Sequence, residues 1–317
     1  MKQVFRRLGM LLLTMIIVSF FTFLAFELVS GDPALARLGT EATPEQLEAL
    51  REEMGLNRNF LLRYADWLSG FFTGDLGESY VYRIPVWTLI APKLEVTLLL
   101  AFMSFVLITV ISLPLGIWSY RLSGGVPDAI GTCFNQLCMA IPPFFVGILF
   151  SWLFGILLRF FTPGNFPDLH SSFGAAFRHL FFAALCLSIP RSAMTVRMMR
   201  STVIGEMQKA YVRTAISRGN DRRGVMLRHV LKNTLTGTIT FLAQTMAEII
   251  GASVVVEQVF GIPGLGRLLV ASISNRDYPV VQVIVVLLAF WVVLAGTIAD
   301  ILNQKIDPRL RLGGDSE

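Results

Sequence analysis

The sequence contains few charged residues. Only 15% of its 317 residues are Asp, Glu, Lys or Arg, and 54% are hydrophobic, whereas a typical soluble domain has about 25% charged residues. So little charge argues against a soluble globular protein, and so much apolar content excludes an intrinsically disordered chain. The length instead suits about six helical membrane spans of roughly 20 residues each, joined by loops.

The residues that most often carry chemistry are also few. Three cysteines cannot form a disulfide framework, and because they lie in or beside apolar runs we interpret them as small buried hydrophobic residues. The three histidines are scattered, so no metal site is expected. These six residues are Cys133, Cys138, Cys186, His170, His179 and His229. None of the motifs G-x-x-x-x-G-K-[ST], H-E-x-x-H, C-x-x-C and G-x-S-x-G occurs, so the sequence predicts neither an enzyme nor a bound cofactor.

Six apolar runs are long enough to cross a membrane as helices, because a helix rises about 1.5 Å per residue and the hydrocarbon core is about 30 Å thick. They lie at about 8–29, 96–118, 133–161, 178–199, 235–256 and 280–302. The first run follows Lys2, Arg6 and Arg7 but is longer than the apolar core of a signal peptide, so we expect it to be retained. The sequence predicts an all-α integral membrane protein with six transmembrane helices.

The basic residues predict the orientation of these spans. If the N-terminus is inside, the inside segments 1–7, 121–132, 191–233 and 303–317 hold 17 Lys and Arg, and the outside segments hold 9. The positive-inside rule therefore places both termini in the cytoplasm. Segment 191–233 alone has ten basic residues and two acidic ones, which accounts for the net charge of +5 without nucleic-acid binding.

Four regions follow from this topology. They are a cytoplasmic N-terminus with the first span at 1–29, an external helical segment at 30–95, a five-helix core at 96–302 and a cytoplasmic tail at 303–317. The external segment has helix signals of its own: Thr43 as N-cap with Gln46 closing a capping box, a helix over Pro44–Met54 ended by Gly55, and an aromatic helix around Phe60–Phe72. Both a packed cap and a docking surface for an external partner remain open for this segment.

Segment 191–233 contains a second polar element. Helical propensity over Met198–Ala215, a break at Gly219-Asn220-Asp221 and a new helix from Asp221 to Asn233 predict a basic hairpin on the cytoplasmic face. It is either a solvated loop that only fixes topology or a docking helix that lies in a groove of a soluble partner. Near the C-terminus, Gly261–Arg267 is not a dinucleotide fingerprint, and predicts a turn followed by a short interfacial helix. A polar turn is expected at Asn275–Pro279.

Carboxylates within or beside apolar runs suggest function, because ionisable groups are costly inside a membrane. Glu248 lies in mid-span with Gln244 one turn earlier, and both a cavity-facing role and a structural polar contact remain open. A structural contact is favoured for Glu257, which precedes polar Gln258. Glu27 and Asp300 lie near span ends. The residues alone leave two functions open: an ion-coupled carrier using Glu248, and a membrane-bound enzyme or scaffold.

The order of motifs resembles, over nearly the whole chain, the inner-membrane permease subunits of ABC importers. The subfamily it resembles is the dipeptide, oligopeptide and nickel permease group, specifically the first permease subunit. The N-terminal motifs are Gly31-Asp32-Pro33, Gly74-Asp75-Leu76-Gly77-Glu78-Ser79, Pro85-Val86, Thr97-Leu98, Leu113-Pro114-Leu115-Gly116 and Ile141-Pro142-Pro143-Phe144. The C-terminal motifs are Tyr211-Val212-Arg213-Thr214-Ala215 with Gly219, Arg228-His229, Asn233, Val256-Glu257, Phe260, Pro263-Gly264-Leu265-Gly266-Arg267, Asn275-Arg276-Asp277-Tyr278-Pro279 and Asp307-Pro308-Arg309.

The resemblance implies a bacterial inner-membrane subunit that works with a second homologous permease, two ATPase subunits and an external solute-binding protein. ATP and Mg would bind the ATPases, and the solute would be a short peptide or a nickel or other metal chelate. Within the coupling loop 200–233, the 206–233 hairpin would contact an ATPase. The coupling residues are Glu206, Tyr211, Arg213, Thr214, Ala215, Gly219, Arg228 and His229, and the candidates for the translocation path are Gln244, Glu248 and Glu257.

Overall fold

The computed structural model describes residues 2–28, 33–39 and 42–306. Their regular secondary structure is helical apart from an isolated antiparallel bridge between Glu78 and Pro85. The chain divides into two compact units. Unit one comprises Met1–Thr97 and Pro263–Val293, and unit two comprises Leu98–Ile262 and Leu294–Glu317. The motif residues Gly31, Asp32, Asp307, Pro308 and Arg309 and the side chain of Asp300 lie outside the described residues.

Five long apolar helices of the described chain meet the length and composition of a membrane span, and a bent helix pair makes a sixth if it counts as one span. The five are Gly9–Leu28 in α1 (Lys2–Leu28), α5 (Val86–Arg121), α8 (Phe173–Met207), Arg222–Phe260 and Tyr278–Ala299 in α13 (Tyr278–Ile306). The all-α membrane fold with up to six spans is therefore confirmed. Each of these helices extends, at one end or at both, beyond the apolar run that predicts it, because polar flanking residues continue the same helical hydrogen bonds.

The third span differs from the single stretch at 133–161 that hydropathy indicates. It consists of α6 (Val126–Ala140), α7 (Pro143–Phe150) and the π-helical segment η1 (Ser151–Leu157), with a bend of 94° between α6 and the rest. Ile141 and Pro142 are extended at the bend. A proline has no N–H to continue α6 and forces the preceding residue out of the helical region, so the two consecutive prolines end one helix and start another.

Helix α8 is longer than the apolar run at 178–199, so three arginines that hydropathy assigns to a loop lie in a helix. Its 35 residues correspond to a length of about 52 Å at the usual helical rise. Arg191, Arg197 and Arg200 therefore lie on the helix itself, although the hydropathy pattern assigned them to the cytoplasmic segment 191–233. The basic charge of that loop is correspondingly smaller, and Arg191 lies at the middle of α8.

Unit one joins both ends of the chain. Its further helices are α2 (Pro33–Leu38), α3 (Pro44–Glu53), α4 (Phe60–Thr73) and α12 (Leu265–Ser274). The α3 capping box is confirmed: the Gln46 N–H donates to Thr43 Oγ1 at 3.3 Å and the Thr43 N–H donates to Gln46 Oε1 at 3.1 Å. The apolar core combines the start of α5 with α12 and α13. Its buried residues are Val86, Ile90, Leu265, Val280, Val283 and Ile284.

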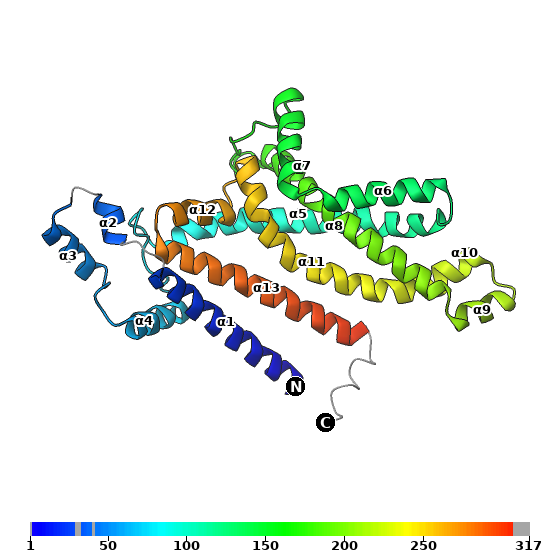
Figure 1. Ribbon diagram of the computed structural model, residues 1–317, viewed down its shortest axis with the longest axis horizontal. Helices are drawn as coiled ribbons and strands as arrows, with labels where there is room; N and C mark the ends of the chain where they lie inside the picture. The colour runs from blue at the N-terminus through cyan, green and yellow to red at the C-terminus, as the bar shows by residue number, and fades with distance from the viewer. Residues whose placement is uncertain (1, 29–32, 40–41, 307–317) are drawn as a thin grey trace. The chain divides into compact units, whose positions relative to one another are not determined.

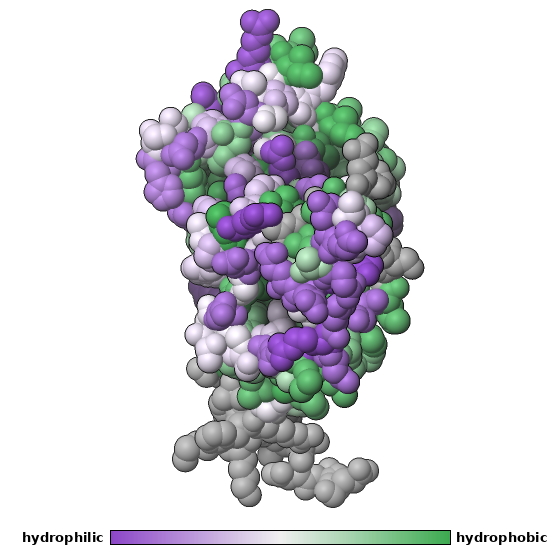
Figure 2. Space-filling model, turned by 90° about the vertical axis from the view of Figure 1, so that its left-hand side faces the viewer, coloured by the Kyte–Doolittle hydropathy of each residue, from purple (hydrophilic) through white to green (hydrophobic). Residues whose placement is uncertain are grey.

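Helix α4 packs across α1 through aromatic side chains. The rings of Phe20 and Phe23 lie 5.3 and 5.6 Å from that of Tyr64, whose hydroxyl is 2.9 Å from Ser19 Oγ. In Figure 1 α1 also runs beside α13. Seen from the side that carries α2–α4, the surface is mainly hydrophilic, with apolar residues along one margin (Figure 2). The segment between α1 and α5 is therefore a folded element with a polar outer face.

Unit two is built around α8, which packs against α6, α7 and α11 (Leu231–Phe260). Two glycines allow close helix contacts. A Cβ on Gly116 of α5 would lie 2.7 Å from the Met199 sulfur, and one on Gly147 of α7 would lie 3.2–3.4 Å from Val259, Phe260 and Cys186. Gly116, the last residue of the motif Leu113-Pro114-Leu115-Gly116, therefore serves packing, since α5 could not approach α8 as closely with a side chain there.

Candidate functional site

The basic hairpin begins where α8 ends. Helix α8 stops at Met207, and α9 (Ala210–Ser217) starts after an extended Lys209. The continuous helix expected over Met198–Ala215 is therefore wrong. The interruption lets α9 turn so that Val212 becomes buried, and this tertiary packing outweighs the local helical propensity of the stretch.

The tip of the hairpin is formed as the sequence predicts. Gly219 has a φ of +87°, a left-handed conformation that favours glycine. The Asn220 side chain bonds to α9: its Nδ2 donates to the Ala215 carbonyl at 3.0 Å. Asp221 then caps α10 (Arg222–Val225) by accepting the Gly224 N–H at 3.1 Å. These local bonds give the turn one defined conformation.

A small apolar core fixes the hairpin to the ends of α8 and α11. The second arm continues from α10 through the π-helical segment η2 (Met226–Val230) into α11. Five buried residues form the core, and Ala215 packs against them. They are Met199, Val203, Val212, Val225 and Val230. Because these residues come from α8, α9, α10 and η2, α9 is packed directly against the ends of two candidate membrane spans.

Glu206 ties the start of the hairpin to α11. Its carboxylate accepts hydrogen bonds from Lys209 Nζ and, at 2.8 Å, from the Tyr211 hydroxyl. Asn233 Nδ2 donates to the same hydroxyl at 3.3 Å. Burial first, and then the Glu206 carboxylate, raise the pKa of Tyr211, so the phenol is protonated near neutral pH and acts as the donor. Residues of α8, α9 and α11 thus share one hydrogen-bond network.

The eight expected coupling residues divide into two groups in this geometry. Glu206, Tyr211, Ala215 and Gly219 hold the hairpin in shape. Arg213 and Thr214 on α9 and Arg228 and His229 on η2 are exposed. Further exposed cations on the hairpin are Arg218, Arg222 and Arg223. Within the described residues none of these arginines forms an ion pair, so the hairpin presents an unpaired basic surface.

An ion pair joins α8 and α11 within their spans. Arg191 Nη1 bonds Glu248 Oε2, and the two side chains are 30% and 52% exposed. Gln244, one turn earlier on α11, is also exposed. The sequence pointed to Gln244 and Glu248 but missed Arg191, because Arg191 begins the basic stretch that hydropathy assigns to a loop. The proline before it, Pro190, lies inside α8 and hides the continuation of the helix.

Glu257 lies in a different environment. It is fully buried in α11, with the Ser253 hydroxyl 3.5 Å from its Oε1. Its burial suits the structural interpretation, and the place of Glu257 among the translocation-path candidates stays a prediction. A second polar contact that the sequence missed joins α8 to α6, where Arg200 Nη2 pairs with Asp128 Oδ2 at 2.7 Å.

In unit one, two motifs 198 residues apart meet at Asp277. The Asp277 carboxylate accepts hydrogen bonds from the Ser79 hydroxyl and, at 2.9 Å, from the Tyr80 N–H. Ser79 Oγ in turn accepts the Tyr82 N–H at 3.0 Å. Within the polar turn expected at Asn275–Pro279, Asp277 has no exposed surface. It anchors the loop after α4 to the start of α13.

Comparison with known proteins gives this arrangement a family. Residues 1–101 match a model described as the N-terminal part of the binding-protein-dependent transport system membrane component, and residues 112–312 match the binding-protein-dependent transport system inner membrane component. The chain belongs to this family of ABC importer permeases. It is a multi-pass inner-membrane transport subunit, as the order of its motifs indicates.

Its relatives are similar over almost their full lengths. The chain is 31% identical to a probable peptide ABC transporter permease protein of Sinorhizobium fredii, over 97% of this chain and 98% of the relative. It is 35% identical to a putative peptide transport system permease protein of Brucella abortus, with the same coverages. It is 31% identical to a nickel import system permease protein of Staphylococcus aureus, over 98% of this chain and 92% of the relative.

The fold also resembles a solved structure. The inward-facing MetNI methionine ABC transporter superposes with a TM-score of 0.56 at 17% identity, covering 69% of this chain and 96% of that one. This likeness concerns the fold of an ABC transporter permease. Among the described residues, no group of three or more His, Cys, Asp and Glu could hold a metal ion.

Proposed function

We propose that this permease pairs with a second homologous permease and forms with it the translocation path for a short peptide or a nickel or other metal chelate. An external solute-binding protein delivers the solute, and two ATPase subunits bind and hydrolyse ATP. The peptide and nickel relatives support this range of solutes. The chain's own role is to hold the path and to convert ATPase motion into helix motion.

The hairpin carries the coupling role. Its supporting observation is the hydrogen-bond network of Glu206, Tyr211 and Asn233, which joins α9 to both α8 and α11. A short helix with an exposed face of Arg213 and Thr214 suits a groove on an ATPase. When the ATPase subunits close, α9 moves with them, and the shared core transmits the motion to two spans as a rigid body.

The same assignment orients the chain. If the hairpin meets ATPases, its side of the membrane is cytoplasmic. With the bent helix pair counted as one span, three spans separate the hairpin from the segment between α1 and α5, so that segment lies outside. With six spans both termini are then cytoplasmic. The excess of Lys and Arg in the segments proposed to be inside supports this orientation.

The Arg191–Glu248 pair and Gln244 are proposed to face the translocation path. Both charged residues lie well inside long apolar helices, and both retain exposed surface. Their mutual pairing reduces the cost of keeping charge in the membrane and still offers one group of each sign to a passing solute. Because Glu248 is engaged by Arg191, the observation does not favour the alternative of a carrier that binds an ion at a free carboxylate.

Reconstitution of the complete importer tests the coupling role. Gly219→Val places a β-branched residue at a φ of +87° at the hairpin tip, where nothing lies within 4 Å, so its effect comes from backbone strain. We expect the importer to assemble and solute uptake per ATP to fall at least about tenfold, because a tilted α9 no longer transmits ATPase closure. Gly205→Ala, in an open site on α8, is the matched control. Normal uptake by Gly219→Val would remove the coupling assignment.

A further inference from the structure

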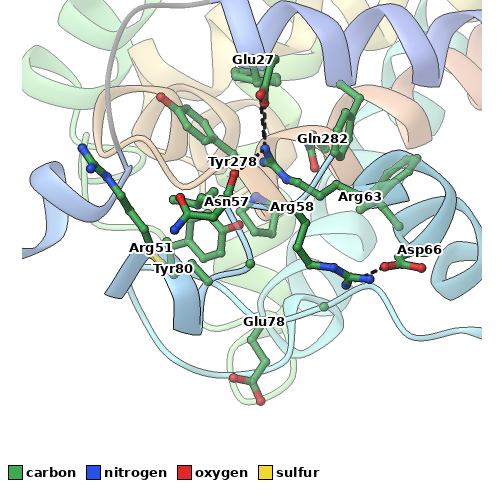
Figure 3. Close-up of a pocket in the computed structure, with 18 of the residues that line it drawn as sticks. Glu27, Arg51, Asn57, Arg58, Arg63, Asp66, Glu78, Tyr80, Tyr278 and Gln282 are labelled. Atoms are coloured by element: carbon green, nitrogen blue, oxygen red, sulfur yellow. Dashed lines mark hydrogen bonds and ion pairs between the residues drawn. The ribbon is translucent and has the colours of Figure 1, made fainter. Parts of the chain in front are cut away.

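Unit one contains a pocket that the transport role does not use. Its volume is about 480 Å³, within the range of ligand-binding clefts. The lining residues come from the ends of α1 and α3, the loop between α3 and α4, α4 itself, the loop after α4 and the start of α13 (Figure 3). Under the orientation proposed above, the pocket opens on the external side of the membrane.

The charged residues at this pocket are mainly paired with each other. Arg63 Nη1 lies 3.0 and 3.3 Å from the two Glu27 oxygens, and its guanidinium lies over the Phe23 ring at 5.7 Å. Arg58 pairs with Asp66 at 2.8 Å. Figure 3 shows both pairs, with the Glu78 carboxylate pointing away from them. The pocket therefore offers no concentrated charge of one sign to attract a metal ion or a phosphate.

Two neutral polar groups at the pocket instead lack hydrogen-bond partners within the described chain. Gln282 is only 7% exposed and lines the pocket, yet its amide forms no hydrogen bond with any described residue. The hydroxyl of Tyr80, also at the pocket, has no hydrogen-bond partner among these residues either. Burial raises the pKa of Tyr80, so this hydroxyl remains protonated and can donate. The Gln282 side chain is held largely buried while its amide faces the pocket, and this points to a hydrogen-bonding group that enters the pocket.

The chemistry of the missing partner follows from these groups. A primary amide donates and accepts at once and is therefore complementary to a peptide group, which does the same. Aromatic rings stand beside it, with Phe26 and Tyr278 5.2 Å apart and Phe23 and Trp67 6.2 Å apart. These surfaces suit the apolar part of an amino-acid side chain. A free peptide would also bring a charged carboxylate end, and the three arginines at the pocket that could receive it are already paired.

We infer that this pocket receives an internal loop of the external solute-binding protein, with the Gln282 amide hydrogen-bonded to a backbone peptide group of that loop. The inference rests on the proposed function and assigns one docking point to it. Tyr80 supplies a second hydrogen bond, and the aromatic lining contacts one side chain of the loop. The recognition depends on neutral hydrogen bonds and shape, since the arginines around the pocket are already paired.

The test uses the complete importer in lipid nanodiscs and its labelled solute-binding protein. Gln282→Leu removes the amide at similar size, and we expect the affinity for the solute-binding protein to fall about tenfold, because a peptide group would be buried unpaired. Tyr80→Phe removes one oxygen and is expected to weaken binding about threefold. The matched controls are Gln258→Leu and Tyr82→Phe, both at exposed positions, and they should bind as the wild type does.

Each outcome has one meaning. If both variants assemble and bind the solute-binding protein as tightly as the controls, the loop assignment is overturned while the importer function stands. If Gln282→Leu fails to assemble, Tyr80→Phe gives the answer alone. If a labelled dipeptide binds the importer without its solute-binding protein and Gln282→Leu abolishes only that binding, the occupant is a free peptide and the assignment is overturned. An importer whose uptake needs no solute-binding protein would instead contradict the proposed function.

Discussion

The hairpin and the pocket in unit one are both polar regions of a mostly apolar chain, but they use charge in opposite ways. On the hairpin, Arg213 and Arg228 are exposed and unpaired within the described residues, while neutral and acidic groups such as Tyr211 and Glu206 are bonded to each other. At the pocket the arginines are paired, and the neutral Gln282 amide has no hydrogen-bond partner among the described residues. On the two proposals above, the hairpin would dock by charge and the pocket by neutral hydrogen bonds.

The largest effect is expected from the anchor beneath the pocket. Asp277→Ala leaves the Ser79 hydroxyl and the Tyr80 N–H without their buried acceptor, and should lower the free energy of unfolding by about 3 kcal/mol. A thermal shift of the detergent-solubilised chain measures this loss. Glu78→Ala, at an exposed position of the same loop, is the control. Equal stability of the two variants would mean that Asp277 does not hold the loop.

A smaller effect on stability but a clear one on transport is expected at the hairpin. Glu206→Ala removes the acceptor of Tyr211 and Lys209, loosens α9 and should reduce uptake per ATP by about tenfold with little change in Tm. Glu52→Ala, on the exposed side of α3, is the control. If uptake per ATP stays normal, the hydrogen-bond network of Glu206 does not couple α9 to the spans. The proposed role of the hairpin in this comparison would then be wrong.

The smallest effect distinguishes the two docking modes by salt. Raising the ionic strength from about 0.1 M to about 1 M shortens the Debye length from about 10 Å to about 3 Å. We expect association with the ATPase subunits to weaken severalfold, because the hairpin's cations are exposed. Binding of the solute-binding protein should change by less than about twofold. Equal salt dependence of the two affinities, measured in the same nanodiscs, would contradict the comparison.

Local signals in the sequence predict local structure well in this chain. The Thr43 and Gln46 capping box, the Gly219 turn and the Asp221 cap depend on residues within a few positions of each other, and all three are confirmed. Hydropathy also locates the spans, because length and apolar content suffice. It averages over Pro142-Pro143, however, and so misses the 94° bend of the third span.

Tertiary contacts account for the rest. The interruption at Lys209 arises because Val212 becomes buried against α8, which the propensity of the stretch does not encode. Hydropathy assigns Arg191 to a loop, because its partner Glu248 lies 57 residues away. The contact of Ser79 with Asp277 spans 198 residues. The open Gln282 amide is visible only once the pocket is formed. Each of these features depends on contacts formed only in the folded chain, which local sequence patterns do not show.

Site-specific photo-crosslinking tests the central claim most directly. A photoreactive residue is placed at exposed Thr214 on α9 and, in a second variant, at exposed Tyr82 beside the anchored loop of unit one, and both are illuminated in the working importer. The account predicts that position 214 crosslinks to an ATPase subunit and position 82 to the solute-binding protein. Crosslinking of position 214 to the solute-binding protein, or to neither partner while uptake is normal, would contradict it.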